Sequence, residues 1–420
     1  MVNIGSVQIE EHLVEELCFL WLWRDASVHA PNFRLIDLTR LDARVDAHLD
    51  ALHVAGEAGW AAIGNAVREN SDVGVTFVAA SVAIAGGAPD RLNEVTEAST
   101  RSSTTREFTS ALASAERNAA VTALERLRIR VESPVRAAYV ATIGARRNDP
   151  GEVLTVFAED RVPEVRARAY RAAGQLGRLD LMTRLRPGLT DPDPECRFWS
   201  AWSAARIGAT EPLDTLADIA WNNLPRADRA LDLMLRRLDV PQANDWLRAF
   251  AKMPDRHHNL IRATGIIGDP LYVPWLIEHM AEPATARLAG ESFSMITGLD
   301  LAYRDLDRHP PAIFQSGPND DPADGSVALD EDERLPWPDP ERIGKWWTAN
   351  RSRFSVGTPY FLGAPKATAD WLEALSDAFQ RQRHAAALEL AIRQPDKAMF
   401  EVRARGRLQR QLLARARGLA

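Results

Sequence analysis

Small and apolar residues recur along the middle of the chain at the three- and four-residue steps of a helix. One such stripe, within residues 165–176, consists of Val165, Ala169, Ala172, Ala173 and Leu176. Polar residues fill the other positions, so this pattern predicts a helix with one buried face. Gly177 follows, and glycine often ends a helix because it adopts the left-handed conformation without strain.

The same pattern returns about every 30 residues, each time with an arginine near the start of the expected helix. The marked positions are Arg136, Arg166, Arg197 and Arg287, with backward steps to Arg106 and Val75 and degenerate copies near Arg226 and His257. A shorter apolar segment, such as 153–158 or 213–220, precedes each marked helix. The sequence therefore predicts an all-α solenoid built from stacked helical hairpins of about 30 residues.

An aspartate stands six positions before two of the marked arginines. Asp160 precedes Arg166, and Asp191 precedes Arg197. Because this spacing places a turn carboxylate near a helix guanidinium of a stacked repeat, we expect these four residues to form a structural ladder. Ligand binding by the same residues is the alternative.

The N-terminal residues predict a cap for the array. Segments 10–24 and 35–55 both have the apolar face of an amphipathic helix. An end repeat must cover the apolar side of its neighbour, so we assign residues 1–70 to a helical cap and residues 71–300 to the repeat array.

The chain after the array differs in composition. Residues 301–340 contain proline, glycine and many acidic side chains, which predicts an irregular acidic insert. Residues 341–420 predict a small, mostly helical C-terminal domain that closes the array, with a turn or hairpin over 354–365.

Composition and charge are those of a folded protein with no general affinity for nucleic acid. Hydrophobic residues make up 46% of the chain and charged residues 26%. The formal net charge of −7 argues against nucleic-acid binding, which requires a concentrated positive field. The two cysteines, Cys18 and Cys196, fit neither a zinc site nor a disulfide framework, and the apolar run 17–23 is too short to cross a membrane. We therefore expect a cytoplasmic protein.

Residues with catalytic potential do not form a recognisable constellation. Asp42, Asp46 and Asp50 lie at helical spacing beside His53, and we interpret them as the solvated face of a helix. His257 and His258 are adjacent in sequence. Their side chains would point about 100° apart on a helix, so they cannot easily share a metal ion. We predict no enzyme activity, no cofactor and no metal site.

Tryptophan and arginine gather in the repeat near residue 200. Exposed tryptophan and arginine dominate the energetics of many protein interfaces, although tryptophan more often fills a core. The residues predicted to bind a protein partner are Arg197, Trp199, Trp202, Arg206 and Arg166.

Several stretches resemble known repeat proteins. The sequence GDPLYVPWLI at 268–277 resembles the opening of a short HEAT-like repeat of the phycobilisome-lyase type. Segments 10–24, 41–60 and 335–350 resemble an uncharacterised proteobacterial HEAT-repeat family that is often encoded with type VI secretion genes. The resemblance supplies no catalytic residues.

This resemblance implies a HEAT-like α-solenoid that acts as a non-enzymatic, protein-binding scaffold. Its partner would be a type VI secretion effector or spike component, for which the chain would serve as an adaptor or chaperone. Two alternatives are an immunity-type binder of a secreted toxin and a nucleic-acid-binding HEAT protein of the alkylpurine DNA glycosylase type. The last would need a continuous groove of exposed arginines.

Overall fold

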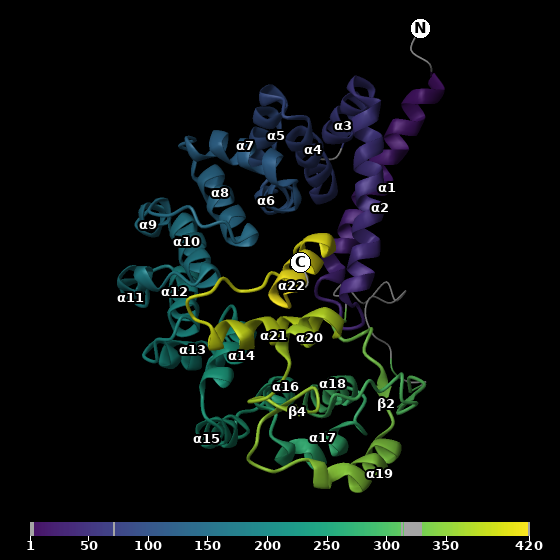
Figure 1. The fold of residues 1–420 in the computed structure, drawn as a ribbon, viewed down its shortest axis with the longest axis vertical. Coiled ribbons are helices and arrows are strands. Elements are labelled where there is room, and N and C mark those ends of the chain that lie inside the picture. Colours follow the sequence, from purple (N-terminus) through teal and green to yellow (C-terminus); the bar gives the residue numbers. More distant parts are fainter. Residues whose placement is uncertain (1–3, 70–71, 312–313, 315–329, 419–420) are drawn as a thin grey trace. The chain divides into compact units, whose positions relative to one another are not determined.

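The computed structural model describes residues 4–69, 72–311, 314 and 330–418. In this part of the chain nearly all regular structure is helical, which confirms the predicted all-α class (Figure 1). The chain forms two compact units. The first unit comprises Met1–His29, Phe33–Pro212 and Leu375–Ala420, and the second comprises Ala30–Asn32 and Leu213–Ala374.

Where it is described, the regular structure of the first unit is helical apart from an isolated antiparallel bridge between Arg34 and Phe379. Its elements are α1 (Ile4–Ser27), α2 (Leu35–Ala55), α3 (Glu57–Glu69), α4 (Val73–Gly86), α5 (Pro89–Arg101), α6 (Thr105–Ser114), α7 (Arg117–Arg128), α8 (Ser133–Arg146), α9 (Val153–Ala158), α10 (Pro163–Leu176), η1 (Leu179–Leu181), α11 (Met182–Gly188), α12 (Pro194–Arg206), α21 (Gln380–Arg393) and α22 (Gly406–Ala416).

The even-numbered helices α4, α6, α8, α10 and α12 pack one against the next, and the odd-numbered α5, α7, α9 and α11 pack beside them. The stripe predicted for α10 is buried along its length, from Val165 at 0% exposure to Leu176 at 7%. Its small residues let the helices approach closely, since a Cβ atom placed on Gly174 would overlap Ser203 of α12. The helix ends where predicted, at Gly177 with φ of +74°.

The first helices of the unit form one packed group. α1 contacts α2, α3 and α4, and the rings of Trp21 and Phe77 stack with their centroids 4.6 Å apart. The segments predicted as amphipathic helices, 10–24 and 35–55, lie within α1 and α2. Their apolar faces are buried, as at Leu38.

The second unit continues the helical pattern and adds two short strand pairs. Its elements are α14 (Ala227–Arg237), α15 (Val240–Phe250), α16 (His257–Ile267), η2 (Pro270–Tyr272), α17 (Val273–His279), α18 (Ala286–Thr297), β1 (Asp307–Arg308), β2 (Trp337–Pro338), α19 (Pro340–Asn350), η3 (Arg351–Arg353), β3 (Tyr360–Phe361) and β4 (Ala364–Pro365). Two further helices, α13 (Pro212–Trp221) and α20 (Trp371–Asp377), each span a boundary between the units.

Helices α14, α16 and α18 pack in series, and their core includes Ile261, Phe293 and Ile343 of α19. β1 pairs antiparallel with β2, so the two ends of the insert lie side by side. β3 and β4 pair antiparallel with Tyr360 opposite Pro365, which confirms the hairpin predicted over 354–365.

The C-terminal 80 residues are shared between the units. Residues 341–420 are predicted as one closing domain, whereas 341–374 lie in the second unit and 375–420 in the first. Within the first unit α22 packs on α2, so the last described helix contacts one of the first.

Candidate functional site

The marked arginines and the turn aspartates pair between successive repeats. Arg136 donates two hydrogen bonds to the carboxylate of Asp160, both at 3.0 Å, and Arg166 binds Asp191 in the same two-pronged manner at 2.9–3.0 Å. Arg166 also donates to the Asp160 carbonyl at 2.9 Å, and Arg197 donates to the Asp191 carbonyl at 2.7 Å. Each aspartate therefore binds the arginine of the preceding repeat through its carboxylate and that of its own repeat through its carbonyl.

The pairing favours the charged forms of Asp160 and Arg166. Burial acts to raise the pKa of Asp160, but hydrogen bonds from Arg136 and from the Val162 amide outweigh it and lower that pKa. Burial likewise acts to lower the pKa of Arg166, and Asp191 outweighs it and raises the pKa. The ladder is thus an ionic connection between neighbouring repeats.

Arg287, the last marked arginine, pairs with a residue of the acidic insert. Its guanidinium binds Asp330 and lies 4.9 Å from the ring centre of Phe314 and 4.8 Å from that of Trp337. Asp330 Oδ1 accepts the amide of Asp332 at 2.9 Å, and Asp160 and Asp191 accept the amide two residues later in the same way. The end of the insert therefore supplies the turn that a further repeat would provide. Residues 312–313 and 315–329 of the insert lie outside the described residues.

The predicted partner-binding residues lie mostly below the surface. Arg166 and Arg197 belong to the ladder just described. Trp199 is 3% exposed and lies between Arg171, whose guanidinium is 4.5 Å from its ring centre, and Trp202. Trp202 is 7% exposed and Arg206 is fully buried.

Arg206 binds a segment from the end of the chain. Residues 394–405, which we name the return segment, join α21 to α22. Arg206 donates to the carbonyl of Pro395 at 2.8 Å and to the carbonyl of Lys397. A protein partner can reach Arg206 only if the return segment leaves it.

Neighbouring repeats bind the next residues of the return segment. Arg147, directly after α8, donates to the Met399 carbonyl at 2.6 Å, and the Met399 amide donates to the Gln175 carbonyl at 2.8 Å. Gly177 has no room for a side chain, because a Cβ atom there would lie within 2.9 Å of the Lys397 main chain. Three successive helices, α8, α10 and α12, thus contact the main chain of one segment.

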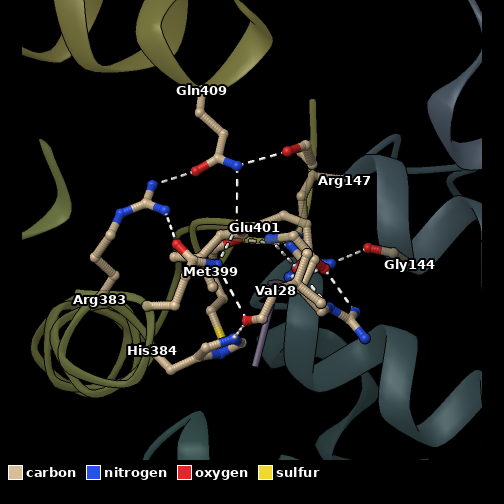
Figure 2. Close-up of polar contacts among 12 residues, drawn as sticks. Val28, Gly144, Arg147, Arg383, His384, Met399, Glu401 and Gln409 are labelled. Carbon is tan, nitrogen blue, oxygen red and sulfur yellow. Dashed lines mark hydrogen bonds and ion pairs between the residues drawn. The ribbon is translucent and has the colours of Figure 1, made fainter. Parts of the chain in front are cut away.

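A buried carboxylate anchors the middle of the return segment (Figure 2). Glu401 lies 3.1 Å from Arg147 and 2.8 Å from Arg403, and its side chain is 9% exposed. Burial acts to raise the pKa of Glu401, but Arg403 and Arg147 outweigh it and hold that pKa well below its ordinary value. Glu401 is therefore ionised inside the first unit.

The end of the return segment and the start of α22 attach to the first helices. Asp42 accepts the Gly406 amide at 2.7 Å and Arg24 Nε at 2.9 Å, and Arg24 also donates to the Ala404 carbonyl at 2.9 Å. Arg405 pairs with Asp46. The interpretation of Asp42 as part of a solvated face is wrong, because this side chain is 6% exposed and satisfies the amide of a helix that returns 364 residues later.

Buried amide and imidazole groups complete the attachment of α21 and α22 (Figure 2). Arg383 donates to the Leu375 carbonyl at 2.7 Å and also binds Gln409, whose amide donates to the Val402 carbonyl at 2.9 Å. Burial lowers the pKa of Arg383 to about 10. His384 contacts the Val28 carbonyl at 3.2 Å, and burial, His29 and Arg403 lower its pKa to about 3.

Apart from Arg206, the residues that bind the return segment are not among those predicted from the sequence to bind a partner, although their spacing follows the repeat. Gln175 and Arg206 each stand nine residues after a marked arginine, and Arg147 and Gly177 each stand eleven residues after one. A comparison of the ends of the repeats, rather than of their starts, would have aligned these positions.

Comparison with protein families identifies HEAT repeats at residues 150–232. HEAT repeats are typical of non-enzymatic scaffolds that bind other proteins. No protein with a curated description matches the sequence. Among the described residues, no helix is long and apolar enough to cross a membrane, and no group of three or more histidine, cysteine, aspartate or glutamate side chains could hold a metal ion.

Proposed function

We propose that this protein is an adaptor or chaperone that holds a protein partner, and that the partner is a type VI secretion effector or spike component. The observation that carries the proposal is the array of stacked helix pairs with HEAT repeats at 150–232, an architecture used mainly to bind proteins. The resemblance of segments 10–24, 41–60 and 335–350 to a family encoded with secretion genes supports the choice of partner.

The contacts that the repeat arginines make favour a protein partner over nucleic acid. A nucleic-acid groove needs cations directed outward to bind phosphates. Arg136 and Arg166 instead bind aspartates of the next repeat, and Arg197 donates to carbonyls of its own turn. Arg168 lies 4.0 Å from Glu164, and Arg171 lies over the ring of Trp199. Each of these arginines therefore has a partner within the array.

The proposal is tested by capture from the native cells. The tagged chain, expressed at its natural level and cross-linked before lysis, should enrich an effector or spike component of the secretion system relative to a tag-only control, as measured by mass spectrometry. The purified partner should then bind the purified chain directly. Recovery of nucleic acid without protein at physiological salt would contradict the proposal. A captured toxin that loses its activity in the complex would instead favour the immunity-type alternative.

The mutations chosen for this test should avoid the buried residues. Trp202 and Arg206 were predicted to bind a partner, but their replacement would also disturb the packing of the first unit, where they are 7% and 0% exposed. Changes on the exposed surface separate binding from folding more cleanly. Val156 on α9, at 69% exposure, and Leu179, at 46%, are suitable first positions.

A further inference from the structure

We propose that the ends of α8, α10 and α12 in the first unit form a binding site for a non-helical peptide segment of the partner, and that the return segment occupies this site when the partner is absent. This inference rests on the proposed function and specifies how the partner is held. It is supported by three features of the contacts between the array and residues 394–405.

The first feature is that the array recognises main-chain atoms. Arg206 binds the carbonyls of Pro395 and Lys397, and Arg147 binds the carbonyl of Met399. The Met399 amide binds the carbonyl of Gln175. Because every residue other than proline carries the same main-chain groups, these contacts accept segments of different sequence.

The second feature is a donor that the return segment leaves unsatisfied. Arg206 is fully buried, and its Nε atom has no hydrogen-bond acceptor among the residues that the structure describes. A buried donor without an acceptor is unfavourable. A peptide that placed one more carbonyl or carboxylate oxygen beside Arg206 would satisfy this site better than the return segment does.

The third feature is the charge of the site. Burial and the neighbouring Arg147 lower the pKa of Arg206 to about 10, so the two guanidinium groups act on each other as like charges. Glu401 supplies a carboxylate beside Arg147. The site therefore fits a peptide with carbonyls directed at both arginines and an acidic side chain two residues after the one that binds Gln175.

A partner peptide must compete for the site with the return segment, because the return segment belongs to the same chain. A tethered segment has an effective concentration far above that of most free ligands, so an untethered peptide of the same sequence competes poorly with it. A partner displaces it only through better contacts or additional ones. The site is thus restricted to ligands that bind it better than the tethered return segment does.

The test uses the full chain and a fluorescent synthetic peptide of residues 394–405 as the probe. In the release variant, Met399→Pro removes the amide that binds Gln175, and Glu401→Ala removes the carboxylate beside Arg147. Fluorescence anisotropy should show that the release variant binds the probe about tenfold or more tightly than the wild-type chain does. Adding Arg206→Met to the release variant should abolish the gain, and the loss is counted only if the variant retains the helical circular dichroism of the wild type.

Lys397→Ala is the matched control, since Arg206 binds the main-chain carbonyl of this residue and the side chain is 68% exposed. It should bind the probe as weakly as the wild type. A release variant that retains the helical circular dichroism of the wild type, yet binds the probe no better, would overturn the proposal.

Hydrogen exchange of the unmodified protein provides a second test that does not depend on a variant folding. The Met399 amide should exchange faster than the amides in the middle of α10, because the return segment can leave while the array stays folded. Exchange of Met399 only at the rate of global unfolding would overturn the proposal. If the probe binds but no secretion component is captured from cells, the peptide site stands and the proposed function fails. If a secretion component is captured but the probe does not bind, the proposed function stands and the peptide site fails.

Discussion

Arginine has two structural roles in the first unit, one near the start of a helix and one near the end. Near the start of a helix it pairs with an aspartate, as Arg166 does with Asp191. Near the end it donates to main-chain carbonyls, as Arg147 and Arg206 do. A planar guanidinium with five donors can satisfy both kinds of acceptor, and lysine cannot reproduce the two-pronged geometry.

Removing one ladder arginine should destabilise the stack. Arg166→Ala leaves the Asp191 carboxylate, 8% exposed, without its cation, and should lower the free energy of unfolding by about 1–3 kcal/mol. Chemical denaturation measures this change. The control is Arg168→Ala, whose side chain is 37% exposed and which should change the free energy by about 0–1 kcal/mol. Equal losses in the two variants would show that the pairing does not connect the repeats.

His384 should make the stability of the first unit depend on pH. Its pKa is about 3 in the folded chain and about 6.5 in an unfolded one, so the unfolded chain gains a proton first as the pH falls. The free energy of unfolding should therefore decrease by up to about 1.4 kcal/mol per pH unit below pH 6.5. Denaturation between pH 7 and pH 4 should show a weaker decrease for His384→Gln than for the wild type. Parallel curves would contradict this assignment.

Small residues fix the distance between stacked helices. Gly174 of α10 lies against Ser203 of α12, and Gly265 of α16 lies against Ser292 of α18. The serine hydroxyls donate to carbonyls of the neighbouring helix, from Ser203 to Tyr170 at 2.7 Å. Close approach and a hydrogen bond between helices therefore occur at the same position of different repeats.

A methyl group at Gly174 should disrupt this contact. Gly174→Ala introduces a Cβ atom that overlaps Ser203, and should destabilise the first unit by about 1–3 kcal/mol. In α19, Gly344→Ala meets no atom within 4 Å and should stabilise the second unit by about 0.5–1 kcal/mol. Denaturant titrations of both variants measure the two changes in the free energy of unfolding, which should have opposite signs. Stabilisation by both substitutions would mean that close packing does not limit position 174.

The sequence predicted the repeat well because its signals are local. The stripe from Val165 to Leu176 and the glycine that ends it lie within one helix, where spacing alone reports which residues share a face. The return segment leaves no such signal. Its contact between Asp42 and Gly406 joins residues 364 positions apart and uses a main-chain amide, which no residue type marks. For the same reason, the burial of Arg206 could not be inferred from its own repeat.

The first unit is discontinuous in sequence. Residues 33–212 and 375–420 belong to it, with the second unit inserted between them. In a simple solenoid each repeat contacts only its neighbours. Here α22 packs on α2, and the return segment connects α12 to the first helices through Arg206 and Asp42. The two ends of the described array are thereby coupled.

A substitution in α22 should consequently loosen α2 as well. Gly406→Leu places a side chain where Thr39 lies and should displace α22. Amide hydrogen exchange should then accelerate both at 406–416 and at 35–46. Arg410→Ala, at an exposed position of the same helix, is the control and should leave both segments unchanged. Acceleration confined to α22 would show that the two ends are not coupled.

This discontinuity has a consequence for synthesis on the ribosome. At 5–20 residues per second, roughly 10–40 s pass between the emergence of residue 212 and that of the last helix. Throughout that interval the nascent chain carries Arg147, Arg206 and Asp42 without the groups that satisfy them. The unfinished protein is therefore most vulnerable to aggregation while residues 213–405 are being translated, and co-translational chaperones should bind it during that period.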